Sequence, residues 1–246
     1  MEVVSHIIKY NSHSTGRDKI CRLFQYASKY ISWYAMNYDN KDLVVKLKNL
    51  ENSLSASRKV LRIGKSIDFL DGAVRSLGIE DPLLRLCLVM AKLSQAVYML
   101  VDHYVWAAKI GLTSADPKLL SKTASKFWLT SLVFNLIRDL YAIVTVVDNH
   151  RRASRRTKTQ REASWDEART VGEETRTVRP NGGWLRLILA NKPLITDTIK
   201  NSADLLLPMA NLGFVDISLK VQGMLGIISS IMGILMVWNP SLKLKP

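Results

Sequence analysis

The sequence predicts an all-α membrane protein, with amphipathic helices in its N-terminal part, an apolar helical hairpin in the middle and a C-terminal transmembrane helix. The run Val221–Trp238 is apolar, and no charged residue lies between Lys220 and Lys243. It is about as long as the roughly 20 helical residues that cross a bilayer core. Upstream, apolar residues recur at steps of three and four, the period of a helix face, without strand-like alternation. The 246 residues also include 12 glycines and 7 prolines, few for a β-rich or disordered chain.

Residues 1–82 form the first predicted region, whose helices we expect to lie in the cytosol and on the membrane surface. Between Thr15 and Met36 apolar residues recur at helical spacing, and the basic residues lie mostly off that stripe. The segment Asn37 to Lys41 is polar and predicts a turn, and Asp42 then opens a second helical stretch with a leucine stripe. The N-terminus lacks the apolar core and cleavage site of a secretory signal. We therefore expect insertion after synthesis, facing a reducing cytosol.

The stretch Ser57–Leu77 carries an apolar stripe beside a basic cluster and is the candidate membrane-binding segment. Such a helix can lie flat in a headgroup layer, with its apolar side between acyl chains and its basic side chains on anionic lipid. The alternative is a soluble bundle whose core takes the same stripe. The stripe differs from that of the preceding helix, which indicates either a break near Ser53–Ser57 or one long helix with two contact surfaces. The candidate lipid-binding residues are Arg58, Lys59, Val60, Arg62, Ile63, Lys65, Ile67, Leu70 and Val74.

Residues 83–147 predict an apolar helical hairpin, with helices over Leu83–Lys109 and Ala124–Val147, and they hold a candidate first span. Each helix carries a narrow polar stripe on an apolar rod. The stripes are Arg85, Lys92, Gln95, Asp102 and His103 in the first helix and Ser131, Asn135, Arg138 and Asp139 in the second. A charge at bilayer depth costs at least about 2.5–3.5 kcal/mol unless it is paired or faces a bundle interior. We therefore expect these helices either to pair with each other or to lie partly in the interface.

The remaining chain predicts a polar linker and a C-terminal anchor. Residues 148–183 begin with an Arg-rich run and then turn mixed and acidic, typical of an exposed linker with or without a short helix. Residues 184–246 resume as helices and end in a transmembrane anchor near 221–238. Small residues four apart on the anchor form a flat strip, which suits self-association or packing onto another span. These helix-packing residues are Gly226, Ser229, Ser230 and Gly233.

The net charge and the sequence motifs limit the classes of function that we expect for the chain. Lysine and arginine outnumber aspartate and glutamate by 35 to 21, a net charge of +14. Such an excess favours polyanions, and the membrane-length segment makes anionic lipid the expected partner, with no nucleic acid. The run Arg151–Arg161 also lacks the aromatic residues that stack on bases. The cysteines and histidines show no metal-ligand spacing and no nucleotide-loop or nucleophile motif occurs, so we predict no enzyme, catalytic residue, cofactor or metal.

Several runs resemble the peroxin-11 family of peroxisomal membrane proteins. They are Ser57–Ser66, Ala107–Leu112, Phe127–Tyr141, Thr198–Pro208 and the ending Leu242–Pro246. They occur in the family's order and together cover essentially the whole chain, with residues 151–178 the least similar part. The resemblance implies an integral peroxisomal membrane protein that elongates and tubulates the membrane before fission, promoting peroxisome proliferation. It also implies that an N-terminal amphipathic helix inserts into the cytosolic leaflet, and Ser57–Leu77 is the matching segment.

The resemblance further implies partners and a topology. Family members form homo-oligomers, act with the dynamin-related fission GTPase and its membrane adaptors, and are delivered by the peroxin-19 import receptor. Two spans, near Leu83–Val105 and Val221–Trp238, would place both termini in the cytosol. That topology puts Arg151–Arg161 in the peroxisomal lumen, against the positive-inside tendency. A solute-conducting pore, lined by the polar stripes of residues 83–109 and 124–147, is the alternative function.

Overall fold

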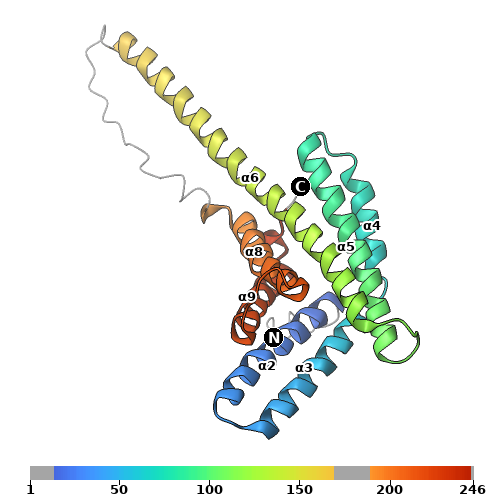
Figure 1. Cartoon of the computed structure of the whole chain (residues 1–246). Helices are drawn as coiled ribbons and strands as arrows, with labels where there is room; N and C mark the ends of the chain where they lie inside the picture. The colour runs from blue at the N-terminus through green and yellow to red at the C-terminus, as the bar shows by residue number, and fades with distance from the viewer. Residues whose placement is uncertain (1–13, 169–188, 245–246) are drawn as a thin grey trace, which may run out of the picture.

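The computed structural model describes residues 14–168 and 189–244, and within these ranges the chain is helical with no strand (Figure 1). The helices are α2 (Ser14–Asn37), α3 (Lys41–Leu61), α4 (Lys65–Ser76), α5 (Pro82–Lys109), α6 (Pro117–Ala168), α8 (Lys192–Leu212) and α9 (Leu219–Trp238), followed by the short 3₁₀ helix η1 (Pro240–Leu242). The all-α prediction is therefore confirmed.

The helices pack side by side around a ring. Helix α3 packs on α2, α2 on α9, α9 on α8, α8 on α6 and α6 on α5, and a smaller contact between α3 and α5 closes the circuit. Helix α4 packs along α5, and both lie on the side of the molecule away from α8 and α9 (Figure 1). This arrangement encloses a space that is lined from several helices.

Helix α2 buries small and polar side chains and exposes large apolar ones. Its small and polar residues Ser28, Ser32 and Ala35 are buried against neighbouring helices, whereas Phe24 and Ile31 are exposed. A soluble bundle would place the large apolar side chains inside. Burial of small residues with apolar side chains outside is typical of helices that pack within lipid.

The structure breaks the candidate membrane-binding segment at a place that differs from the expected one. Helix α3 ends at Leu61 and α4 begins at Lys65. Gly64 between them has a φ of +85°, a left-handed conformation that glycine adopts without steric cost. The region around Ser53–Ser57, where a break was one of the two alternatives, lies inside α3, and the other alternative, one long helix, does not describe the segment either. The break in the segment is therefore a glycine turn, which lies a few residues after the point where the apolar stripe changes.

Within the described residues, three helices are long and apolar enough to cross a membrane: α5, residues Pro117–Arg152 of α6, and α9. The sequence predicted spans in α5 and α9, and α6 adds a third candidate. Helix α6 also continues to Ala168, so residues 148–168, expected to be a linker, are helical. No glycine or proline follows Pro117 in α6, and nothing in its sequence therefore terminates the helix there. The helix expected over 184–191 lies mostly outside the described residues.

Candidate functional site

The ring of helices surrounds a cavity of about 590 Å³ whose walls carry many charged side chains beside apolar ones. It is lined from α2, α3, α4, α5, α6 and α8, and from residues at the C-terminal end of the described chain. The polar stripes of α5 and α6 both face it, through Lys92 and Asp102 on α5 and Asn135 and Arg138 on α6. The expectation that these two helices pair is met, and their charged groups find partners on α3 and α8.

Asp18 of α2 is the centre of the first group of buried ion pairs. Its Oδ1 accepts hydrogen bonds from Nε of Arg58 at 3.1 Å and from Nε of Arg62 at 2.8 Å. Asp18, Arg58 and Arg62 are each exposed by less than a tenth. Burial opposes ionisation of Asp18, but the nearby cations, Arg62 first, hold the pKa of its carboxyl below the usual value. Asp18 therefore stays charged and fastens the end of α3 to α2.

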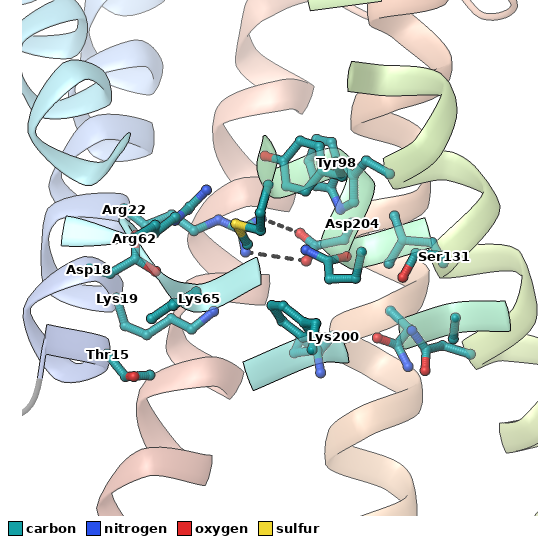
Figure 2. A pocket seen from close by; sticks show the side chains of 18 of the residues that line it. Thr15, Asp18, Lys19, Arg22, Arg62, Lys65, Tyr98, Ser131, Lys200 and Asp204 are labelled. Atoms are coloured by element: carbon teal, nitrogen blue, oxygen red, sulfur yellow. Dashed lines mark hydrogen bonds and ion pairs between the residues drawn. The ribbon is translucent and has the colours of Figure 1, made fainter. Parts of the chain in front are cut away.

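A second group of ion pairs joins the other helices across the cavity. Figure 2 shows Arg22 of α2 reaching toward Asp204 of α8, with which it forms a bidentate ion pair. On the α6 side, Arg138 pairs with its neighbour Asp139 and with Asp197 of α8. Lys59 of α3 likewise pairs with Asp102 of α5. Buried charges are tolerated when paired in this way, so the pairs fix which helices meet.

The structure places the basic members of the predicted lipid-binding set inside the bundle. Arg58 and Arg62 are buried against Asp18, Lys59 pairs with Asp102, and Lys65 lines the cavity. The sequence predicted that these basic side chains flank the apolar stripe on an outer face. In the structure they do not. The physical reason is that carboxylates on α2 and α5 compete for them.

The apolar members of the same set lie outside. Val60, Ile63, Ile67, Leu70 and Val74 have between 44% and 68% of their surface exposed, and Leu77 continues the row. A row of large apolar side chains on one face is not an arrangement that water favours. The soluble-bundle alternative, in which this stripe fills a core, does not describe the structure. Lipid contact by these residues stays a prediction.

The small-residue strip of α9 lies against α2 of the same chain. A Cβ added at Gly226 would come within 2.1 Å of the Tyr26 ring, and one at Gly223 within 2.8 Å of Tyr30 Cβ. Ser229 and Ser230 have no exposed surface, and Gly233 faces the aliphatic part of Lys19. The strip is thus covered by α2, which is not one of the candidate spans. Its two expected uses, self-association and packing onto another span, stay predictions.

Three of the four carboxylates that organise the site were not predicted, since only Asp102 belonged to a polar stripe recognised in the sequence. Asp18, Asp102, Asp197 and Asp204 all line the cavity, each paired with a lysine or arginine of another helix. The available signal was their isolation, because single aspartates stand on otherwise apolar helix faces in α5 and α8. No group of three His, Cys, Asp or Glu that could hold a metal occurs within residues 14–168 and 189–244.

These features define a helical membrane protein that pairs charged side chains inside its bundle and exposes many large apolar ones. The family model for Peroxisomal biogenesis factor 11 (PEX11) matches residues 4–238, and the chain belongs to this family of peroxisomal membrane proteins. The resemblance found in the sequence is thereby confirmed.

Relatives align over nearly the whole chain. It is 29% identical to Peroxisomal membrane protein 11B of Homo sapiens, with 97% of this chain and 98% of the relative covered. It is 33% identical to Peroxisomal membrane protein 11A of Mus musculus, with the same coverage. It is 27% identical to Peroxisomal membrane protein PMP30B of Candida boidinii, over 96% of this chain and 94% of the relative. No solved structure matches the chain.

Proposed function

We propose that this protein resides in the peroxisomal membrane and elongates it, so promoting peroxisome proliferation and fission. The observation that carries the proposal is the exposed apolar stripe of α3 and α4, made up of Val60, Ile63, Ile67, Leu70 and Val74. Helix α4 packs along α5, a candidate span, so its stripe is presented next to a membrane-crossing helix. The relatives named as peroxisomal membrane proteins support the compartment.

The stripe acts as a wedge in the cytosolic leaflet. Each large apolar side chain that leaves water contributes about 1.5–3 kcal/mol when fully buried, so insertion of the row is strongly favourable. Inserted volume in one leaflet expands that leaflet and bends the membrane. The charged neighbours on the exposed surface of α4 are Asp68, Asp71 and Arg75, which carry no net positive charge. Insertion of α4 in this packed state therefore depends on apolar area more than on attraction to anionic lipid.

The direct test replaces two residues at the centre of the stripe. We expect the full-length double variant Ile67→Asp, Val74→Asp, reconstituted into vesicles, to lose most of its membrane tubulation. Each aspartate in the acyl region costs about 2.5–3.5 kcal/mol, enough to keep α4 out of the leaflet. Both positions are exposed by about two thirds, so the bundle itself should fold normally. Electron microscopy of the vesicles measures tubulation, and flotation verifies that equal protein is inserted.

The matched control, Asn49→Asp with Ser53→Asp, adds the same charge to exposed positions of α3 away from the stripe. It should tubulate like the unchanged protein. Equal tubulation by the stripe variant would defeat the wedge mechanism. Replacing Arg58, Arg62 and Lys65 by glutamate tests lipid attraction less cleanly, because it also removes the partners of Asp18.

Self-association completes the proposed mechanism, because a scaffold of copies adds their local bends. The small-residue strip of α9 is occupied by α2, so the available surface of α9 is its other face. Apolar residues on that face are exposed and alternate at steps of three and four, the repeat of a helix-pairing seam. They are Val221, Met224, Ile228, Ile231, Leu235 and Trp238.

The hairpin of α5 and α6 bears on topology. If both helices cross, the chain returns to the side on which α5 began, so Arg151 and Arg152 share that side with residues 14–81. This placement satisfies the positive-inside tendency, which the two-span topology did not. If α9 crosses as well, three spans place the two termini on opposite sides of the membrane, so the predicted cytosolic position of both termini requires that only two of the three helices cross. Delivery by the peroxin-19 import receptor and action with the dynamin-related fission GTPase and its adaptors stay predictions.

A solute-conducting pore is the second candidate, favoured by the cavity between the polar stripes of α5 and α6. Lys92 lines the cavity, whereas Arg85 lies on the exposed surface of the same helix. If the cavity conducts, Lys92→Ala should change the conductance or ion selectivity of the full-length protein in planar bilayers, and Arg85→Ala should not. A silent bilayer containing correctly inserted protein would remove this candidate.

A further inference from the structure

The positive charge around Asp18 exceeds what Asp18 can balance. Its carboxylate already accepts hydrogen bonds from Arg58 and Arg62, and the electrostatic influence of Lys19 and Lys65 also reaches it. Among the described residues, the side chain of neither lysine forms an ion pair or a hydrogen bond. Both nonetheless line the cavity. Four basic groups thus gather about one carboxylate in a place with limited access to water, where charging all four is costly without a further counter-charge.

The other described residues that line the cavity do not supply that counter-charge. Ten lysine and arginine side chains line it, against four aspartates. Asp102, Asp197 and Asp204 are each engaged by a lysine or arginine of another helix, as is Asp18. A folded protein keeps such an excess of buried positive charge most readily when an anion occupies the space.

We infer that the cavity binds a phosphate monoester, with the phosphate held between Lys19 and Lys65. Figure 2 shows these two lysines on one side of the cavity and Lys200 on the opposite side. A phosphate monoester carries about 1.5–2 negative charges and three acceptor oxygens, which suits several cations converging from different helices. A carboxylate brings one charge and two oxygens and would leave more of the positive charge unbalanced.

The cavity also has room and surface for the organic part of the ligand. Its volume of about 590 Å³ is within the range of about 300–1,000 Å³ that is typical of small-molecule sites. Apolar side chains line it beside the lysines, among them Phe69, Leu88 and Met99. A phosphorylated solute and the headgroup of a phospholipid share this chemistry, and the experiment below separates them.

Lys19 links binding to pH. Burial and the adjacent Arg22 lower its pKa from 10.5 to about 7, although Asp18 opposes the shift. The other charged groups acting on it are Arg62, next to the cavity on the α3 side, and Lys200 of α8. A bound phosphate favours the charged lysine, so binding near neutral pH should take up protons. Raising the pH from 7.5 to 8.5 should therefore weaken binding several-fold.

The test uses the full-length protein in nanodiscs of phosphatidylcholine. One arm titrates glycerol 3-phosphate by calorimetry, and the other incorporates phosphatidic acid and detects the bound lipid by native mass spectrometry. We expect the double variant Lys19→Met, Lys65→Met to bind the recognised ligand at least tenfold more weakly. The control Lys41→Met, Lys48→Met, which removes two exposed lysines of α3, should bind as the unchanged protein does.

A charge-conserving variant separates loss of the site from loss of the fold. Lys19→Arg with Lys65→Arg should retain binding in the arm where the unchanged protein binds. Binding in the soluble arm alone assigns the site to a phosphorylated solute, and binding in the lipid arm alone assigns it to a headgroup. Binding in neither arm, or equal binding by the methionine double variant, would overturn the inference. Neither result bears on the apolar stripe, because tubulation is measured separately.

Discussion

Replacing Asp18 by asparagine is expected to lower the free energy of unfolding by about 3–5 kcal/mol, the usual cost of removing one partner from a buried ion pair. Asparagine keeps the shape of the side chain but leaves Arg58 and Arg62 without their carboxylate. Such a loss is a large fraction of the stability of an ordinary domain. Unfolding of the full-length protein in detergent micelles, followed by tryptophan fluorescence, measures it.

The expected effect depends on pH in a defined direction. Burial works against the charged form of Asp18, but Arg62 and Lys19 lower the pKa of its carboxyl below the ordinary value of 3.8. Its stabilising contribution is therefore fully present above the unfolded pKa, and it is lost only as the pH falls through the lowered, folded value. The stability difference between the unchanged protein and Asp18→Asn should shrink in strong acid, and near neutral pH it should fall as the pH rises and Lys19, whose charged form Asp18 favours, loses its proton.

Asp42 provides the matched control for Asp18. It pairs with Lys46 one turn away at 2.6 Å, and both side chains are more than two thirds exposed. Asp42→Asn should change stability by less than about 1 kcal/mol, as exposed pairs do. Combining Asp18→Asn with Arg58→Met should cost less than the sum of the two single changes. In each single variant one charge stays buried without its partner, whereas the double variant contains neither charge. A loss below 1 kcal/mol for Asp18→Asn would show that the pairs around it do not hold α3 on α2.

Helices and membrane segments could be predicted from this sequence because they follow from local periodicity and length. The runs over Leu83–Lys109 and Val221–Trp238 gave helices within a few residues of the observed bounds. Local pattern also predicted the polar stripes of α5 and α6. Helix bounds were missed where one residue type decides them. The turn at Gly64 ends α3 before α4 begins, and the absence of glycine and proline extends α6 to Ala168.

The cavity could not be predicted because its charges belong to helices far apart in sequence. Arg22 and Asp204 are separated by 182 residues, and no spacing rule relates them. A basic cluster beside an apolar stripe is typical of a membrane-surface helix, and that pattern is present around Arg62. In the folded protein, however, Asp18 and Asp102 compete with lipid for the same side chains. Only the tertiary arrangement determines which partner faces them.

For the small-residue strip on α9, likewise, the sequence indicated a close helix approach but not which helix makes it. Small residues four apart correctly indicated a close helix approach at Gly226 and Ser230, since both are buried. The partner is α2, and the side chain that fills the gap is Tyr26. An aromatic residue on an amphipathic helix gives no indication in the sequence of which glycine it will cover.

Replacing Gly226 by alanine should therefore detach α2 from α9. The added Cβ would lie 2.1 Å from the Tyr26 ring, a distance at which the ring must move. Overpacking of this kind costs about 1–3 kcal/mol, and occasionally more. The ring also lies under the guanidinium of Arg22, 5.5 Å from its centroid, so displacing it disturbs the pair that Arg22 makes with Asp204. We expect a loss of about 3 kcal/mol in the free energy of unfolding, measured in detergent micelles.

Gly72→Ala in α4 supplies a control with the same chemical change, because its Cβ would meet only the flexible end of Lys92, at 3.3 Å. It should alter stability by less than about 1 kcal/mol, since alanine also favours the helix. Adding Tyr26→Ala to Gly226→Ala should restore part of the loss by removing the clashing ring.

Tyr26→Ala alone uncovers the small-residue strip. If copies associate through the outer face of α9 instead, it should leave the oligomer size unchanged, whereas Ile228→Ala with Ile231→Ala should reduce it. A larger oligomer for Tyr26→Ala would instead assign the strip to self-association.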